Sequence, residues 1–175
     1  KILVVEDSKT QADLLCYYLT QAGYHAIPVD CPASAFTLLS DSSVDLILTD
    51  IIMPGMDGYV FCHTLRNDPK YSSIPIVFVS QLSDPADIIK GLCCGANNFI
   101  IKPVRKEQLI SEVNNIFSQK MNASQGHEDA GGVLPFHYEN HTYSIRSSRY
   151  DLLRILLSIY QTAAQKNSEL EQTTR

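Results

Sequence analysis

The sequence lacks several features that would assign it to a large class of proteins. No apolar run approaches the roughly 20 residues needed to cross a bilayer, and no segment has the pattern of a signal peptide. Lys and Arg are outnumbered by Asp and Glu, at nine against thirteen up to residue 120 and five against six after it. Because neither half is cationic, we expect this chain not to bind nucleic acid, and the lack of a long apolar run predicts no membrane contact by this segment.

The cysteines also lack any spacing typical of a disulfide framework or a zinc site. They are Cys16, Cys31, Cys62, Cys93 and Cys94, and no two of them form a C-x-x-C pair. Cys93 and Cys94 are adjacent, which is a poor geometry for a bridge. We therefore expect reduced thiols in a cytoplasmic protein.

Short apolar runs rich in Ile and Val alternate with segments of helical period. The runs are continuous, which is typical of strands covered on both faces in a parallel sheet. They cover residues 2–5, 44–48, 76–79 and 99–101, with a weaker run at 24–29. Helices are predicted over 8–22, 33–40, 58–67, 85–94 and 104–119, with Ser8 and Asp57 as N-caps. This alternation predicts an α/β fold with a doubly wound sheet.

Charged and polar side chains stand where these predicted strands end. The first strand is followed by Glu6 and Asp7, and the third by Asp50. The fourth delivers Ser80, and the fifth delivers Lys102. In an open parallel sheet, ligands bind outside the carboxyl ends of the strands, so we expect these five groups to meet at one edge.

The three carboxylates of this predicted cluster require a cation. Close carboxylates repel one another and raise one another's pKa values unless a positive ion joins them. Oxygen ligands favour a hard divalent ion, and Mg²⁺, which keeps several waters, fits best. Flanked by the ion and Lys102, Asp50 would be a nucleophile toward an anionic electrophile. Phosphoryl transfer meets that description, because its catalysis is mostly positioning and charge neutralisation.

Four segments, in order along the chain, carry a resemblance to a known family. They are "ILVVEDS", "DLILTDIIMPGMDG", "IPIVFVSQLSD" and "ANNFIIKP". Residues 1–120 resemble the receiver domain of two-component response regulators over that whole length. The resemblance implies a flavodoxin-like (βα)5 fold with strand order 2-1-3-4-5, in a bacterial phosphorelay protein.

The resemblance implies a role for each acidic residue of the site. Asp50 would accept a phosphoryl group from a phosphohistidine, carried by a sensor histidine kinase or a phosphotransfer protein. Mg²⁺ would bind Glu6, Asp7, Asp50 and the backbone carbonyl of Ile52.

The resemblance also implies the roles of the remaining site residues. Lys102 would pair with the phosphoryl oxygens, and Ser80 would turn inward to donate a hydrogen bond to one of them. Phe99 stands where the family carries its aromatic switch. The peptide bond between Lys102 and Pro103 would be cis, which proline permits at small cost.

The sequence departs from the family pattern around the site. Receivers usually carry a small residue after the hydroxyl residue, and here it is Gln81. Ile52 and Leu82 stand two positions after Asp50 and Ser80, where the family borders the path of water to the phosphoryl group. We hypothesise that Ile52, Gln81 and Leu82 narrow this path and slow hydrolysis.

Beyond residue 120 the pattern changes. Residues 121–132 are polar and glycine-rich and predict a linker, and 133–146 predict a small β-hairpin. Residues 147–175 predict a long helix, whose coiled-coil seam would be Leu153, Leu156, Tyr160, Ala163, Asn167 and Leu170. In a homodimer Asn167 would set the register, and the alternative is a helix packed on its own domain.

The tail carries no recognisable catalytic motif. Residues 121–175 resemble no ATP site, glycine-rich phosphate loop or helix-turn-helix, so this segment alone is neither a kinase nor a transcription factor. Residues 136–172 resemble the connector that follows an N-terminal receiver in some hybrid sensor kinases. We expect part of a longer protein, such as a hybrid histidine kinase, with an output domain in cis after the helix.

Two other functions remain open at this point. One is a Mg²⁺-dependent phosphatase with an aspartate nucleophile, but that class needs a second Asp at the position of Ile52. The other is a receiver-like module that acts without phosphorylation, which the intact set of site residues argues against.

Overall fold

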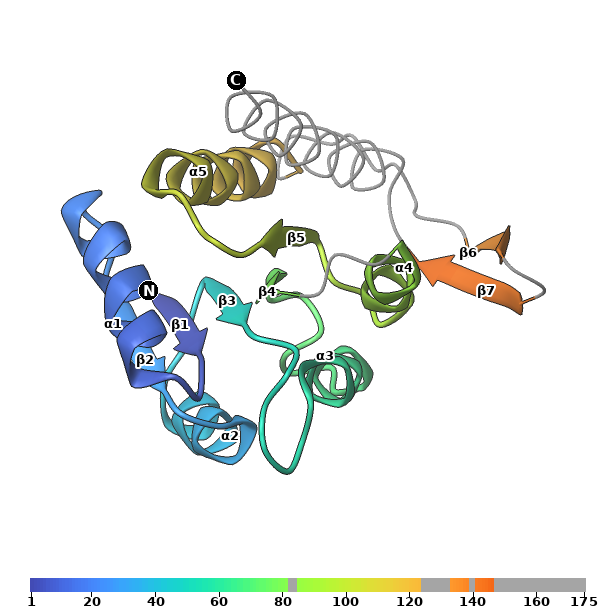
Figure 1. The fold of residues 1–175 in the computed structure, drawn as a ribbon, viewed down its shortest axis with the longest axis horizontal. Helices are drawn as coiled ribbons and strands as arrows, with labels where there is room; N and C mark the ends of the chain where they lie inside the picture. The colour runs from blue at the N-terminus through green and yellow to red at the C-terminus, as the bar shows by residue number, and fades with distance from the viewer. Residues whose placement is uncertain (82–84, 124–132, 139–140, 147–175) are drawn as a thin grey trace, which may run out of the picture.

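The computed structural model describes residues 1–81, 85–123, 133–138 and 141–146 (Figure 1). Its strands are β1 (Ile2–Val5), β2 (Ala26–Val29), β3 (Leu46–Thr49), β4 (Ile76–Ser80), β5 (Asn98–Ile101), β6 (Val133–Tyr138) and β7 (His141–Arg146). Its helices are α1 (Lys9–Gln21), α2 (Pro32–Asp41), α3 (Gly58–Asn67), α4 (Pro85–Cys93) and α5 (Lys106–Ala123). Within these residues, no helix combines the length and the hydropathy that a membrane span requires.

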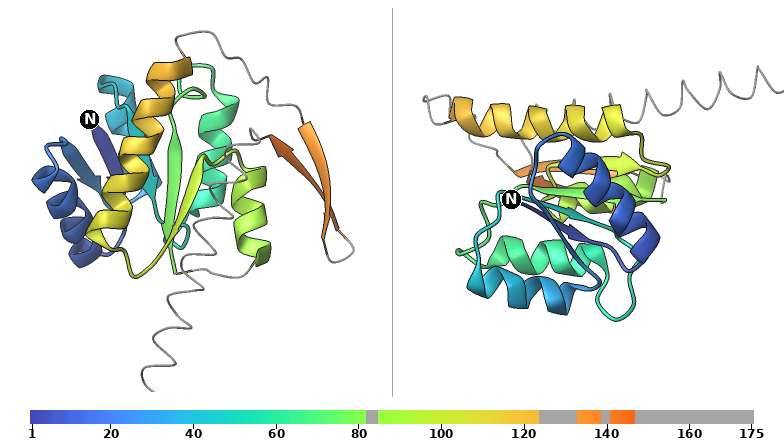
Figure 2. Two further views of the ribbon diagram at one scale, coloured as in Figure 1. Left: turned by 90° about the horizontal axis from the view of Figure 1, so that it is seen from above. Right: turned by 90° about the vertical axis from the view of Figure 1, so that its left-hand side faces the viewer.

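The first five strands form one parallel sheet in the order β2-β1-β3-β4-β5, which confirms the predicted flavodoxin-like topology. Helices cover both faces, with α1 and α5 on one side and α2, α3 and α4 on the other (Figures 1 and 2). The strand order reverses beside β1, because β2 lies on one side of it and β3 on the other. The carboxyl ends of β1 and β3 therefore lie side by side, at the switch point where such sheets bind ligands.

Four of the five strands of this sheet are buried along their whole length, as their continuous apolar sequences predict. Every residue of β1, β3, β4 and β5 is buried, whereas the edge strand β2 is partly exposed. Burying each Val, Leu or Ile side chain contributes roughly 1.5–3 kcal/mol to folding, before the entropy cost is counted. The two hydrophobic layers on either side of the sheet hold the strand ends in fixed positions.

The helix boundaries follow local signals with two differences from expectation. The Asp57 carboxylate accepts a hydrogen bond from the Val60 amide at 2.8 Å, so the predicted cap of α3 is present. Ser8 is the N-cap residue of α1, but its side chain makes no capping bond. Helix α5 continues to Ala123, so the first three residues of the predicted linker are helical. No Gly or Pro occurs between Lys106 and Gly126 to stop the helix.

The strands β6 and β7 pair antiparallel as a separate two-stranded sheet, within the range where a hairpin is predicted. This hairpin lies beside α4, away from the five-stranded sheet (Figures 1 and 2). Glu139 and Asn140, which separate the two strands in the sequence, lie outside the described residues. So do most of the predicted linker and the whole predicted helix at 147–175 with its coiled-coil seam.

Candidate functional site

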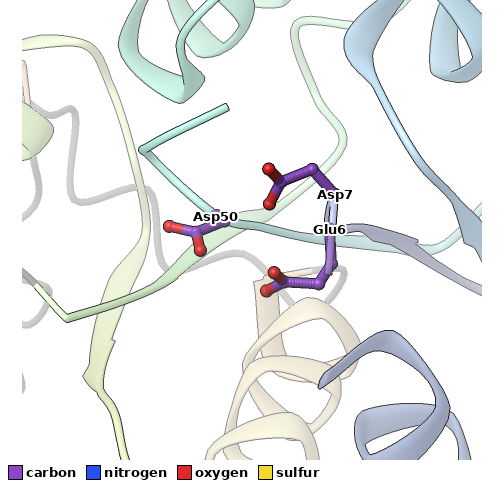
Figure 3. A group of neighbouring side chains, drawn as sticks. All are labelled: Glu6, Asp7 and Asp50. Atoms are coloured by element: carbon purple, nitrogen blue, oxygen red, sulfur yellow. The ribbon is translucent and has the colours of Figure 1, made fainter. Parts of the chain in front are cut away.

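Three carboxylates meet at the carboxyl ends of β1 and β3 (Figure 3). Val5 and Thr49 are paired in the sheet, so the residues that follow them, Glu6 and Asp50, emerge together. Glu6, Asp7 and Asp50 each offer one oxygen within 4.8 Å of the others. Glu6 and Asp50 are buried and Asp7 is exposed, so the cluster opens to solvent on the Asp7 side.

The Lys102 ammonium joins two of these carboxylates. It follows β5, and its Nζ donates to Glu6 Oε2 at 2.7 Å and to Asp50 Oδ2 at 2.5 Å. The backbone amide of Lys102 donates to the carbonyl of Ser80 at 2.8 Å, which ties this residue to the end of β4. The peptide bond from Lys102 to Pro103 is cis, as the family resemblance implies. Residues remote in the sequence thus form one charged cluster.

The second oxygen of Asp50 is held by the backbone. Its Oδ1 accepts hydrogen bonds from the amides of Ile51 at 2.5 Å and Ile52 at 3.1 Å. With Oδ2 bound to Lys102, both oxygens have partners and the carboxylate has one orientation. These two amide donors could not be predicted from the sequence, because a backbone N–H has no signature in the residue type.

The cluster keeps an excess of negative charge. Burial raises the pKa of the Glu6 carboxyl, the neighbouring Lys102 opposes this rise, and the negative charge of Asp50 adds to it. One ammonium therefore balances three carboxylates only in part. The ligands are all hard oxygen atoms, and their spacing and charge fit a divalent cation such as Mg²⁺.

The predicted switch residues lie at the same edge and beneath it. Ser80 is the last residue of β4 and is fully buried, and it pairs in the sheet with Ile101 of β5. Phe99 is buried on β5, with its ring edge-on to Phe78 at a centroid distance of 6.1 Å. The fold therefore places Ser80 beside Lys102, and Phe99 in the layer covered by α4.

Of the three residues predicted to border the water path, two fall within the described part of the chain. Ile52 is 59% exposed and Gln81 is exposed. Leu82 lies outside the described residues. Next to Gln81 and Lys102, an open cavity of about 490 Å³ is lined mainly by apolar side chains of α1 and of the segment after β5.

Comparison with known proteins finds relatives for the part of the chain that forms the five-stranded sheet. The family model for the response regulator receiver domain matches residues 2–114. The DNA-binding response regulator MtrA of Mycobacterium tuberculosis is 34% identical over 113 residues, which cover 65% of this chain and 48% of that protein. The response regulator PleD of Caulobacter vibrioides is 34% identical over 121 residues, 69% of this chain and 27% of its own length. The chain thus spans about half or less of these two relatives.

Solved structures agree with the sequence relatives. The signal receiver domain of a histidine kinase from Syntrophus aciditrophicus is 38% identical, with a TM-score of 0.63, covering 77% of this chain and 98% of that one. A response regulator from Chloroflexus aurantiacus is 30% identical, with a TM-score of 0.65, covering 67% and 96%. Together with the match over residues 2–114, these likenesses show that the chain belongs to the receiver-domain family of two-component response regulators.

Proposed function

We propose that Asp50 is the residue that accepts the phosphoryl group in this receiver domain. The observation that carries the proposal is the fixed orientation of its carboxylate, with the Ile51 and Ile52 amides on Oδ1 and Lys102 on Oδ2. An Asp50 oxygen attacks the phosphorus of a phosphohistidine, forming a P–O bond. The P–N bond to the imidazole breaks, and its electron pair returns to the ring nitrogen. The Lys102 ammonium neutralises charge on the phosphoryl oxygens during the transfer.

The three carboxylates and the Ile52 carbonyl are proposed to hold Mg²⁺. Support comes from the mutual spacing of Glu6, Asp7 and Asp50 and from the incomplete neutralisation of their charge by Lys102. The bound ion would supply positive charge to the phosphoryl oxygens. The Lys102 ammonium is paired with the carboxylates of both Glu6 and Asp50. Once a cation neutralises these carboxylates, the ammonium can turn toward an arriving phosphoryl group.

The signal is proposed to leave the site through Ser80 and Phe99. The Ser80 hydroxyl would turn to donate to a phosphoryl oxygen, and the Phe99 ring would move with it. Support comes from their places at the end of β4 and on the paired strand β5. A change in these two strands reaches α4, which covers this face of the sheet.

The phosphoryl donor and the output are proposed to lie outside this chain segment. The donor would be a sensor histidine kinase or a phosphotransfer protein. The output domain would follow in cis, linked by the helix predicted at 147–175, through which two copies would dimerise. The net charge of −5 supports a segment that does not itself bind nucleic acid. The DNA-binding activity in the name of MtrA describes that longer protein.

A phosphatase that uses an aspartate nucleophile is not favoured by this site. Such an enzyme needs an acidic residue two positions after its nucleophile, and Ile52 stands there. An apolar side chain cannot protonate a leaving group.

Exposure to a small acyl phosphate separates these functions. The chain is incubated with Mg²⁺ and acetyl phosphate, and its intact mass is followed with time. A phosphorylated switch gains one phosphoryl mass, which Asp50→Asn abolishes and omission of Mg²⁺ strongly reduces. A phosphatase would release phosphate continuously without a lasting adduct, and a module that works unphosphorylated would show neither. Either of these last results would overturn the proposal.

A further inference from the structure

The first residue of α3 lies in direct contact with the backbone of the proposed phosphoacceptor. A Cβ atom on Gly58 would lie 2.3 Å from the Asp50 carbonyl oxygen and 2.8 Å from Ile51 Cα. Both distances are far inside van der Waals contact, and both atoms belong to the main chain. No side-chain rotation could relieve such a contact, so the helix or the Asp50–Ile51 peptide would have to move.

Conformation does not explain the glycine at this position. Gly23 and Gly55 have positive φ angles, which favour glycine, but Gly58 does not. Alanine is the better helix former, so α3 by itself would favour it at its first residue. The lack of space beside the Asp50 backbone therefore explains why residue 58 has no side chain.

The peptide that Gly58 touches also orients the Asp50 carboxylate. Its N–H, from Ile51, donates to Asp50 Oδ1. Its carbonyl oxygen accepts a hydrogen bond from the buried Thr49 hydroxyl at 2.9 Å. One residue further on, the Ile51 carbonyl accepts from the Gly58 amide at 2.8 Å. The strand end and the start of α3 are thus locked together around this peptide.

We propose that Gly58 and Thr49 are positioning residues for phosphorylation: they fix the Asp50–Ile51 peptide, and through its N–H they fix the carboxylate that attacks phosphorus. This inference rests on the proposed function of Asp50. A methyl group at position 58 displaces the peptide, turns Oδ1 off its amide donors, and moves Oδ2 relative to Lys102. The Ile52 carbonyl, proposed to bind Mg²⁺, moves with the same loop.

Gly58→Ala is the direct test, and Gly23→Ala is its matched control. Gly23 has φ +86° and no atom within 4 Å of its added Cβ, so alanine there strains the backbone at a place remote from the site. We expect Gly58→Ala to lower the initial rate of phosphorylation by acetyl phosphate about tenfold or more, because small displacements of reacting groups are costly. Gly23→Ala should keep the wild-type rate even where it melts earlier.

A second measurement reports on the position of the Asp50 carboxylate when no phosphoryl donor is present. In ¹H–¹⁵N NMR spectra of the unphosphorylated chain, Gly58→Ala should shift the Ile51 and Ile52 amide signals and weaken Mg²⁺ binding. Folded Gly58→Ala with unchanged amide signals and a phosphorylation rate within about twofold of wild type overturns the inference. If the wild type itself is not phosphorylated, the proposed function fails, while the amide signals still decide whether Gly58 positions the carboxylate.

Thr49 keeps the inference testable if Gly58→Ala does not fold. Thr49→Val has nearly the same shape but no hydroxyl, so it should lower the rate and shift the Ile51 amide signal. Thr49→Ser restores the hydroxyl and should recover most of both. Equal behaviour of the Val and Ser variants overturns the inference for this residue.

Discussion

Two partly buried cationic side chains lie at opposite edges of the sheet and have different kinds of partner. Lys102 follows the carboxyl end of β5 and donates to the carboxylates of Glu6 and Asp50. Arg66, in the last turn of α3, lies at the other edge, where β4 and β5 begin.

Arg66 connects three segments of the chain through uncharged oxygens. It donates to the carbonyls of Gly95 at 2.8 Å, Ile74 at 2.7 Å and Ser72 at 3.1 Å, and to the side-chain oxygen of Asn97 at 2.9 Å. The same Asn97 oxygen accepts from the amide of Ile76, the first residue of β4. The planar guanidinium, with five N–H groups in fixed directions, suits this set of acceptors.

This difference between the partners of Lys102 and Arg66 indicates which edge of the sheet can change its contacts. The partners of Lys102 carry more negative charge than it neutralises, so a metal ion or a phosphoryl group can redistribute its contacts. The partners of Arg66 named above are oxygens of the segments that lead into β4 and β5, so these contacts hold the starts of the two strands together. One edge of the sheet is therefore suited to a switch, and the other to holding the strands in place.

The largest effect is expected at Lys102. Lys102→Met keeps the length of the side chain and removes its charge, so the phosphorylation rate should fall by roughly 100-fold or more, in the range of a lost electrostatic group at a reacting centre. The measurement is the initial rate with acetyl phosphate at saturating Mg²⁺. A rate near wild type would show that Lys102 is only a structural partner, like Arg66.

The opposite pattern is expected at Arg66. Arg66→Met removes this donor from three partly buried oxygens, and it should lower the free energy of unfolding by about 1–3 kcal/mol. Phosphorylation per folded molecule should stay within about twofold of wild type. Urea unfolding measures the first quantity and intact mass the second. A large loss of phosphorylation in the folded variant would remove the distinction between the two edges.

A moderate effect is expected from the residues that are predicted to border the water path. Replacing the exposed apolar side chain of Ile52 by a polar one in Ile52→Asn should shorten the phospho-Asp50 lifetime several-fold, and we expect the same of the polar substitution Leu82→Glu. A polar group there can orient an attacking water, with an effect of about 1 kcal/mol on the barrier. Decay of the phosphoryl mass after removal of the donor is the measurement. Unchanged lifetimes in both variants would discard the hypothesis of a narrowed path.

A further effect of Arg66→Met is expected at a nearby thiol. Burial raises the pKa of Cys62 to about 12, although Arg66 opposes the rise, and its Sγ donates to the Cys94 carbonyl at 3.3 Å. Because the folded state holds this proton more tightly than the unfolded state, the stabilisation is complete below about pH 8.5 and is lost as pH rises toward 12. At pH 8, alkylation of Cys62 should need unfolding. Arg66→Met should therefore speed it, and equally slow labelling in that variant would contradict the prediction.

Much of the fold could be predicted because its signals are local. The continuous apolar runs of β1, β3, β4 and β5 predicted a parallel sheet, and the alternation with helices predicted the doubly wound topology. Asp57 was identified as a cap from its place before an apolar helical pattern. Helix α5 extends past its predicted end at residue 119, because the residues that follow are polar but include no Gly or Pro that would stop a helix before Gly126.

The sequence was enough to predict which residues meet at the site, but not the contacts that they make there. The place of Glu6, Asp7, Asp50 and Lys102 at strand ends was enough to bring them to one edge. That Lys102 binds Glu6 as well as Asp50 depends on side-chain directions in the packed fold. The contributions of Gly58, Thr49 and the Ile51 amide depend on main-chain contacts, which residue types do not encode.

The sequence by itself determined the order of the elements, the buried faces of the strands and the residues delivered to the carboxyl edge. These follow from hydrophobic periodicity and from the rule that parallel strands end at the same side of a sheet. Only the tertiary structure decided which oxygen of Asp50 faces Lys102 and which faces the backbone amides, and how closely α3 approaches. The physical reason is that hydrogen bonds and steric contacts act over a few ångströms, and those distances exist only once the helices have packed on the sheet.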